Sequence, residues 1–105
     1  MGGTVSDEVK LMVKNEIESH KVMVFSKTTC PYCVMAKNAL KDAGVPYEVM
    51  ELDQRSDGGQ IQQVLQDITG ASTVPRVFIN GKCIGGGTET KAMQKNGQLL
   101  KLFQA

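Results

Sequence analysis

The hydrophobic and polar positions in the first half of the chain switch between helical and strand spacing. Apolar residues recur every three to four positions over 9–17, which predicts an amphipathic helix beginning after Ser6. The unbroken apolar run 22–25 (VMVF) is typical of a strand covered on both faces. A second helical pattern covers 35–43, and near-alternation over 47–52 predicts a second strand. Because strand–helix–strand units almost always close with a right-handed crossover, we expect the two strands to be parallel.

The second half predicts a helix followed by a hairpin. Apolar residues at helical spacing over 61–68 indicate a third helix, which ends at Gly70. The apolar run 77–79 and the pair Cys83-Ile84 flank Asn80-Gly81, a strong short-range signal for a two-residue hairpin. We therefore expect two antiparallel strands here.

The last segment predicts a divided helix and completes the fold class. The triple glycine Gly85–Gly87 leads into Thr88, which is placed to cap a helical stretch that Gly97 breaks in two. Together the elements predict an α/β domain with a mixed four-stranded sheet flanked by helices. We expect residues 1–105 to form one domain, with a flexible N-terminal segment over 1–5.

Composition and charge narrow the classes of function. The 105 residues carry a net charge of +1 and include only two Tyr, three Phe and no Trp. A nucleic-acid-binding module would need a basic surface and usually stacking rings, so we expect no nucleic-acid partner. Three cysteines are too few, and odd in number, for a disulfide scaffold, and residues 1–10 do not resemble a secretory signal. These features predict a cytoplasmic location.

The N-terminus carries one separate pattern. Residues 1–6 (MGGTVS) fit the M-G-x-x-x-[ST] pattern for N-myristoylation at Gly2. Such a short pattern often matches by chance, and a single myristoyl chain gives only marginal membrane binding. We expect no membrane partner, and we expect the chain to be a monomer.

The candidate chemistry lies in Cys30-Pro31-Tyr32-Cys33, between the first strand and the second helix. An ordinary thiol is only about 3% ionised at neutral pH, and only the thiolate is nucleophilic. Unpaired N–H groups at the start of the helix face the sulfur of Cys30, and Lys27 adds a positive charge nearby. We therefore predict that Cys30 attacks and that Cys33, one turn deeper and more buried, resolves.

The cysteines also allow two other interpretations, a zinc site and a structural disulfide. A zinc site would need Cys30, Cys33, Cys83 and His20 as ligands, without a second pair at metal-binding spacing. A structural disulfide would suit a secreted chain. We expect neither, and we expect Cys83 to be a small buried or half-buried hydrophobe rather than a regulatory thiol.

The segment 29–33 (TCPYC) after the first strand, and 73–90 (TVPRVFINGKCIGGGTET), resemble a dithiol glutaredoxin of the thioredoxin superfamily. The resemblance covers Val5 to Phe103, and CPYC is specific because thioredoxins usually carry Gly-Pro between their cysteines. It implies a thioredoxin-like fold and the reduction of protein and low-molecular-weight disulfides, especially glutathione mixed disulfides. Glutathione would be the reducing co-substrate, no cofactor would be tightly bound, and the partners would be glutathionylated or disulfide-containing proteins.

The same resemblance implies the catalytic steps. Cys30 would attack the glutathionyl sulfur and hold glutathione as a mixed disulfide, which a second glutathione then reduces. In the alternative dithiol route, Cys33 would close a disulfide with Cys30.

A glutathione site can also be assigned from the resemblance, one position at a time. Lys27 and Gln62 would bind the glycine carboxylate, and Val74 would pair its backbone with the cysteinyl part, as an added strand does at a sheet edge. Thr88 and Glu89 would bind the γ-glutamyl end. The full set is Lys27, Tyr32, Gln62, Thr73, Val74, Pro75, Gly86, Thr88 and Glu89.

Two positions of the site resemble the family closely and two depart from it. Tyr32 would border the sulfur, and Pro75 resembles the family's cis-proline beside the cysteines. Glu89 stands where Asp is usual and is one methylene longer. Gly87 stands where other members carry Cys, Asn or Ala, a difference that we expect to matter little.

Two rival functions remain open at this point. Some glutaredoxins hold a [2Fe–2S] cluster between two protomers through the first active-site cysteine and glutathione, mostly with CGFS or with Ser in place of the motif proline. Pro31 argues against this alternative. A thioredoxin-like reductase fed by a reductase enzyme is the other alternative, and the glutathione-site residues argue against it.

Overall fold

The computed structural model describes residues 5–105. The predicted flexible segment 1–5 and the N-myristoylation pattern at Gly2 therefore lie outside the described residues, apart from Val5 and Ser6. Val5 is partly buried and packs against a core cluster, and Ser6 caps the first helix by accepting a hydrogen bond from Val9 N (3.2 Å). Within the described part of the chain, no helix has the length and apolar character to cross a bilayer.

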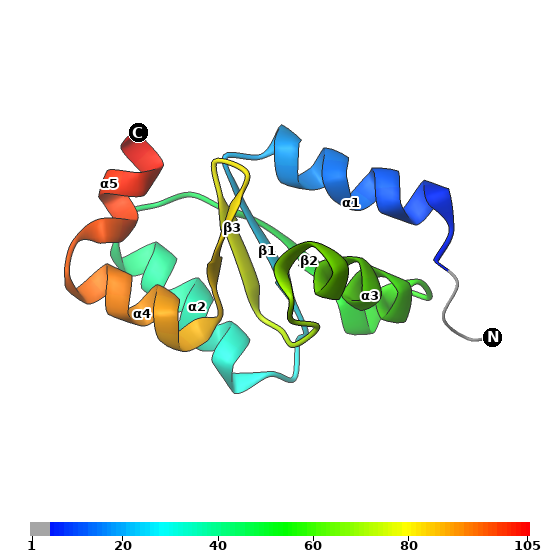
Figure 1. Cartoon of the computed structure of the whole chain (residues 1–105). Helices are drawn as coiled ribbons and strands as arrows, with labels where there is room; N and C mark the ends of the chain where they lie inside the picture. Colours follow the sequence, from blue (N-terminus) through cyan, green and yellow to red (C-terminus); the bar gives the residue numbers. More distant parts are fainter. Residues whose placement is uncertain (1–4) are drawn as a thin grey trace.

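Four strands form one mixed sheet in the order β2–β1–β3–β4 (Figure 1). The strands are β1 (Val22–Ser26), β2 (Glu48–Glu51), β3 (Arg76–Ile79) and β4 (Lys82–Gly85). β1 pairs in parallel with β2, while the β1–β3 and β3–β4 pairs are antiparallel. The predicted mixed four-stranded sheet is confirmed, and β1 is buried along its whole length, as an uninterrupted apolar run requires.

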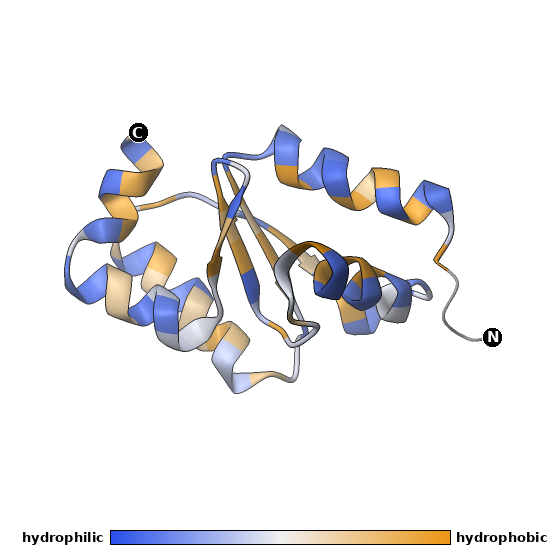
Figure 2. Ribbon diagram, in the orientation of Figure 1, coloured by the Kyte–Doolittle hydropathy of each residue, from blue (hydrophilic) through white to orange (hydrophobic). Residues whose placement is uncertain are grey.

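Helices cover both faces of this sheet (Figure 1). On one face lie α1 (Asp7–Ser19) and α3 (Gly58–Thr69), which contact each other. On the other face lie α2 (Pro31–Asp42) and α4 (Gly87–Lys95), followed by the short α5 (Gln98–Gln104). β1 and β3 are hydrophobic along most of their length, whereas the helices carry one hydrophobic and one hydrophilic side (Figure 2).

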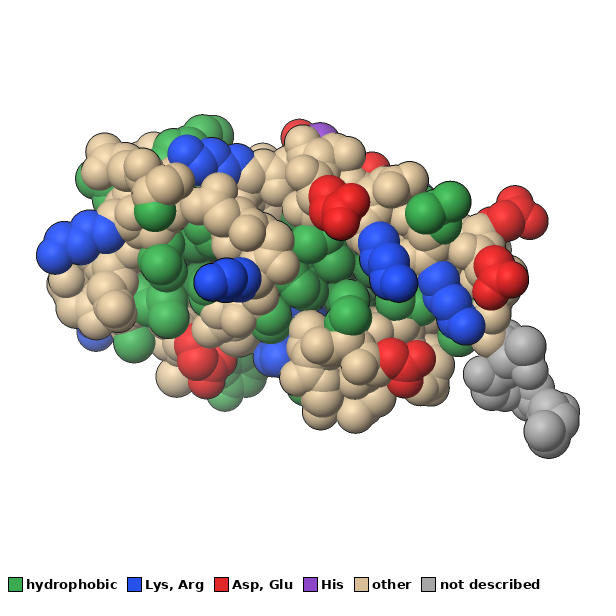
Figure 3. Space-filling view, turned by 45° about the horizontal axis from the view of Figure 1, so that its top comes forward, with side chains coloured by type: hydrophobic (Ala, Val, Ile, Leu, Met, Phe, Trp, Pro, Cys, Tyr) green, Lys and Arg blue, Asp and Glu red, His purple; other side chains and the backbone are tan. Residues whose placement is uncertain are grey.

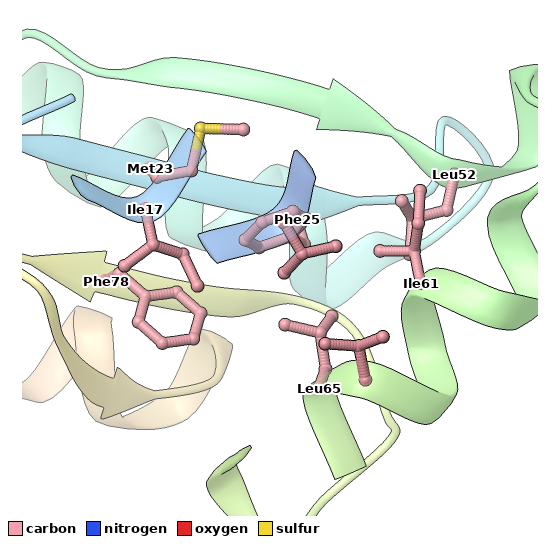
Figure 4. Close-up of a cluster of buried hydrophobic side chains, with 9 residues drawn as sticks. Ile17, Met23, Phe25, Leu52, Ile61, Leu65 and Phe78 are labelled. Atoms are coloured by element: carbon pink, nitrogen blue, oxygen red, sulfur yellow. The ribbon is translucent and has the colours of Figure 1, made fainter. Parts of the chain in front are cut away.

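A core cluster lies between the sheet and the α1–α3 layer (Figure 4). Phe25 of β1 and Phe78 of β3 meet edge to face at its centre, with ring centroids 5.8 Å apart and planes at 84°. Ile61 and Leu65 of α3 and Ile17 of α1 close over the rings. Burying each such side chain stabilises the fold by about 1.5–3 kcal/mol.

A second cluster lies beneath α2 and α4. Val22 and Val24 point into it, whereas Met23 and Phe25 point into the first cluster. This division follows from the two-residue period of a strand. Both helical layers therefore depend on alternate side chains of the same strand.

Most predicted turns and breaks are confirmed. Asn80 and Gly81 have φ angles of 51° and 82°, as the predicted two-residue hairpin turn requires. Gly70 ends α3 with φ 81°, and Gly97 separates α4 from α5 with φ 82°. The second predicted strand is shorter than 47–52, because Leu52 begins a single 3-10 turn, η1 (Leu52–Gln54).

Two details of the predicted helices are wrong. Thr88 does not cap the last helical stretch, because α4 already begins at Gly87 and Gly86 occupies the capping position. Ile68 does not complete the buried stripe of α3, since it is 45% exposed while Ile61 and Leu65 are fully buried.

Candidate active site

Cys30 occupies the capping position of α2, directly after the turn that leaves β1. Its sulfur accepts a hydrogen bond from the backbone N–H of Cys33 at 3.3 Å. Pro31 follows at the first helical position, where the missing N–H costs no helix hydrogen bond. The Cys30 sulfur therefore lies at the positive end of the helix dipole, where a negative charge is stabilised.

Cys33 lies one turn further into α2 in a different environment. Its side chain is 0% exposed, whereas that of Cys30 is partly exposed, so the predicted order of burial is confirmed. Burial, followed by the side-chain hydrogen bond with Cys30, raises the pKa of the Cys33 thiol. The backbone N–H of Lys27 also contacts the Cys33 sulfur, at 3.4 Å. The pair thus combines one accessible sulfur with one buried thiol that stays protonated at neutral pH.

The loop before β3 lies against the Cys30 sulfur. The Val74–Pro75 peptide bond is cis, and the Cys30 thiol donates to the Val74 carbonyl at 3.7 Å. Thr73 is exposed beside this contact, while Pro75 is buried. The structure therefore brings Thr73, Val74 and Pro75 to the motif, although 44 residues separate Cys30 from Val74.

Gln62 of α3 forms a hydrogen bond with this loop. Its side-chain amide donates to the Ser72 carbonyl at 2.9 Å, two residues before Val74. The predicted ligand for a glycine carboxylate thus also fixes the loop that faces Cys30. Its remaining donor and acceptor capacity is available to a bound molecule.

The start of α4 packs against the CPYC motif. A Cβ atom added at Gly87 would lie 2.5 Å from the Tyr32 carbonyl oxygen, closer than real Cβ atoms approach. Only glycine allows α4 to approach the backbone of Tyr32 this closely. The expectation that glycine at position 87 matters little is therefore wrong for this backbone. Tyr32 itself points outward and is 56% exposed.

Glu89 has a role in the structure besides the one predicted for it. Its Oε1 accepts a hydrogen bond from the Gly86 N–H at 2.7 Å, which satisfies one free donor at the start of α4. This hydrogen bond is the main cause that lowers the pKa of the Glu89 carboxyl, and the charge of Arg76 contributes. Thr88 beside it is exposed, and Gly86 is buried.

Arg76 is a neighbour of the site that the sequence reasoning missed. Its Nε donates to the Pro75 carbonyl at 3.0 Å, and its guanidinium lies close to Gly86. Arg76 thus adds a positive charge between the cis-proline loop and the start of α4. Its position directly after Thr73-Val74-Pro75 was the available signal.

Asp53 was also missed, and no local pattern indicated it. Its carboxylate accepts hydrogen bonds from the backbone N–H and the hydroxyl of Thr28, two residues before Cys30. Lys27, the residue before Thr28, is the one in this turn that was assigned to glutathione, and it is partly exposed. The contact joins residues 25 positions apart and depends on the pairing of β1 with β2.

Cys83 and His20, which the alternative zinc site would need beside Cys30 and Cys33, have different neighbours from the motif. Cys83 lies on β4, half-buried against the first core cluster, as expected of a small hydrophobe. His20 lies near carboxylates of Glu16 and Glu48, at 3.7 and 4.0 Å. Within residues 5–105, no group of three or more His, Cys, Asp or Glu side chains could hold a metal ion.

The surface carries charge of both signs. Hydrophobic side chains occupy the middle of the face in Figure 3, with Lys, Arg, Asp and Glu scattered around them and neither sign gathered in one patch.

Comparisons with known proteins agree with this geometry. The family model described as Glutaredoxin matches residues 22–84. A glutaredoxin from Ricinus communis is 51% identical over 90 residues, which are 86% of this chain and 88% of that protein. Oxidized glutaredoxin 2 from Chlamydomonas reinhardtii superposes with a TM-score of 0.87 at 50% identity, covering 96% of this chain and 95% of that one. A buckwheat glutaredoxin–glutathione complex gives a TM-score of 0.84 at 38% identity, covering 94% of each chain.

The comparisons also correct the expected location. Relatives named "Glutaredoxin-2, mitochondrial", from Bos taurus and Homo sapiens, are 48% and 47% identical over 90 residues, 86% of this chain. The chain spans only 57% and 55% of the length of these two relatives. Their names point to mitochondria rather than the cytoplasm, although the relatives from plants include proteins without that word, such as glutaredoxin-C4 from Arabidopsis thaliana. The cytoplasmic prediction is therefore wrong.

Proposed function

The chain belongs to the glutaredoxin family of thiol-disulfide oxidoreductases, and from this premise we propose that it reduces glutathione mixed disulfides with glutathione as co-substrate. The observation that carries the proposal is the convergence of two distant segments on the CPYC motif. The carbonyl before the cis Val74–Pro75 bond contacts the Cys30 sulfur, and the start of α4 at Gly87 packs against the Tyr32 backbone. Other substrates would be low-molecular-weight disulfides and disulfide-containing proteins, and no tightly bound cofactor is required.

The first step is a thiol–disulfide exchange at Cys30. Its thiolate attacks the glutathionyl sulfur of a mixed disulfide, and a new Cys30–glutathione S–S bond forms as the old one breaks. The substrate cysteine leaves as a thiolate and takes a proton from water. The N–H of Cys33, 3.3 Å from the Cys30 sulfur, favours the attacking anion.

The second step regenerates the enzyme. The thiolate of a second glutathione attacks the glutathionyl sulfur held on Cys30, so oxidised glutathione departs and Cys30 returns as a thiolate. The sum is one mixed disulfide and one glutathione converted to one free protein thiol and one oxidised glutathione.

Cys33 takes part only in the dithiol route. Its raised pKa and complete burial keep it from attacking external disulfides at neutral pH. Once a disulfide joins Cys30 to a protein substrate, Cys33 can attack the Cys30 sulfur and release the reduced substrate. The Cys30–Cys33 disulfide is then reduced by two glutathione molecules.

The residues around Cys30 support glutathione as the occupant of the site. The Val74 backbone lies beside the sulfur, where the peptide of glutathione would pair with it. Lys27 and Gln62 supply a charge and an amide for the glycine carboxylate, and the N–H groups that begin α4 suit the γ-glutamyl carboxylate. The similar buckwheat glutaredoxin has been crystallised as a complex with glutathione.

The test is turnover of a glutathionylated peptide at varied glutathione concentration. We expect wild type to saturate with glutathione, Cys30→Ser to lose turnover, and Cys33→Ser to retain most of it. Cys83→Ser is the matched control, because Cys83 lies on β4 outside the motif and should leave the rate unchanged. Turnover by wild type that is independent of glutathione would refute the proposal.

A further inference from the structure

The segment between β1 and α2 is a tight turn that carries two residues of the proposed site. The Cys30 N–H donates to the Lys27 carbonyl at 3.1 Å, which closes the turn over residues 27–30. The Lys27 N–H donates to the Cys33 sulfur at 3.4 Å. The backbone of Lys27 therefore contacts both cysteines, and its conformation determines where the Lys27 side chain leaves the chain.

A single carboxylate holds this turn from outside. The Thr28 N–H lies 3.1 and 3.2 Å from the two Asp53 carboxylate oxygens, and the Thr28 hydroxyl donates to the same carboxylate. These hydrogen bonds, with a smaller contribution from the charge of Lys27, lower the pKa of Asp53. A charged carboxylate accepts hydrogen bonds more strongly than a neutral acceptor does, which suits Asp53 to holding the turn.

The parallel pairing of β1 with β2 brings Asp53 to Thr28. Ser26 at the end of β1 pairs with Glu51 at the end of β2, and the strands are parallel. Two further residues along each chain lead to Thr28 and Asp53, so the contact extends the strand pairing beyond the last ladder position. The register of the two strands therefore determines where Asp53 contacts the turn that carries Cys30.

We propose that Asp53 is a positioning residue, whose carboxylate fixes the 27–30 turn and thereby the distance between the Lys27 ammonium and the Cys30 sulfur. The inference rests on the proposed function, because this distance matters where one molecule, glutathione, must contact both groups. Misplacing either contact weakens binding and the alignment of the sulfur atoms.

The charge of Asp53 alone predicts the opposite effect. A negative group near Lys27 repels the carboxylates of glutathione, so removing it would strengthen binding if charge were its only influence. Removing a positioning group would weaken binding. The sign of the change in KM for glutathione therefore separates the two roles.

The experiment measures kcat and KM for glutathione in Asp53→Ala, Asp53→Asn and Thr28→Val. We expect Asp53→Ala to raise KM about fivefold to tenfold with a smaller change in kcat. Thr28→Val removes only the hydroxyl contact and should raise KM less. Asp53→Asn keeps one acceptor oxygen for the Thr28 N–H and should fall between wild type and Asp53→Ala.

Asp57→Ala is the matched control. Asp57 is also a carboxylate with a lowered pKa, but its partner is Arg55, at 2.8 Å from Oδ1. Its removal changes the net charge equally without touching the turn, so KM should stay within about twofold. An unchanged or lower KM in Asp53→Ala would overturn the inference, as would an equal rise in Asp57→Ala.

Further outcomes separate a folding defect from a failure of the proposed function and from a failure of the positioning role. If Asp53→Ala does not fold in a thermal melt, Thr28→Val and Asp53→Asn decide, and KM values equal to wild type in both would overturn the inference. If wild type itself shows no saturation by glutathione, the proposed function fails whatever the variants do. If wild type saturates and the Asp53 variants match it, only the positioning role fails.

Discussion

Cys30 and Cys33 belong to the same helix, yet the protein surrounds them differently. The Cys30 sulfur receives an N–H at the helix start and remains partly exposed, whereas Cys33 is closed off from solvent. Because burial disfavours the charged form, the pKa of the Cys33 thiol is raised, and Cys30 carries the sulfur that an external disulfide can reach. Under the proposed mechanism, this difference in burial sets the order in which the two thiols act.

The absence of a side chain at Gly87 also shapes the candidate site, because it lets α4 contact the backbone of Tyr32. We expect Gly87→Ala to destabilise the protein by about 1–3 kcal/mol, because its Cβ would lie 2.5 Å from the Tyr32 carbonyl. Gly59→Ala is the control, since a Cβ there meets nothing within 4 Å and alanine favours a helix by about 0.5–1 kcal/mol. Urea unfolding measures both changes, and equal stability of the two variants would contradict the tight contact.

At the scale of elements, two side chains of the first turn of α4 stabilise the start of that helix. The Oε1 of Glu89 accepts from the Gly86 N–H, and the Thr90 hydroxyl donates to the Gly86 carbonyl. These two contacts fix the start of the helix from inside, without a capping side chain at position 86. The helix therefore begins one residue earlier than the predicted cap at Thr88.

The Glu89 contact predicts a pH-dependent contribution to stability. The pKa of Glu89 is lowered in the folded protein from its ordinary value of 4.5, so the contribution is present above that value and lost as the pH falls through the lower, folded-state pKa. We expect wild type to lose more unfolding free energy than Glu89→Gln between pH 7 and the acid range, by a few tenths of a kcal/mol up to about 1 kcal/mol. Glu18→Gln on α1 is the control, and identical pH profiles for wild type and Glu89→Gln would contradict the role of the carboxylate.

Elements with strong local signals could be predicted from the sequence, whereas contacts between elements could not. Asn80-Gly81 specifies its hairpin locally, and the apolar run 22–25 specifies a buried strand. The contact of Asp53 with Thr28 requires the register of two strands, which no short window contains. Ile68 continues the period of α3 and lies beside Ile17 and Phe78, but it remains 45% exposed at the edge of an open hollow.

The residues of the candidate site likewise divide into those that local sequence predicts and those that depend on contacts between elements. Cys30 and Cys33 follow from spacing and helix position, while Val74 reaches them only through the order of strands in the sheet. The resemblance to a family supplied Val74 in advance, because it carries information about the whole fold. Arg76 was signalled only by its position after Pro75, and Asp53 by no local pattern, because its contact with Thr28 depends on the pairing of β1 with β2.

At the scale of the whole molecule, β1 joins the two helical layers. Its side chains alternate between the clusters, with Phe25 under α1 and α3 and Val24 under α2 and α4. The same strand leads into the active-site turn and pairs with both β2 and β3. Neither layer can lose its packing without disturbing the strand that supports the other.

This arrangement predicts that the protein unfolds as one cooperative unit. We expect Phe25→Leu to lower the unfolding free energy by about 1–2 kcal/mol, because it leaves part of a fully buried aromatic site unfilled. The free energy of amide protection should fall equally in α3 and in α2, although α2 lies on the face of the sheet that Phe25 does not contact. The two changes are equal because global unfolding exposes both helices. Leu11→Ala, at a side chain that is 60% exposed, should leave protection in both helices unchanged. Loss of protection in α3 alone would show instead that the layers open separately, and the active-site helix would then keep its stability when the opposite face is damaged.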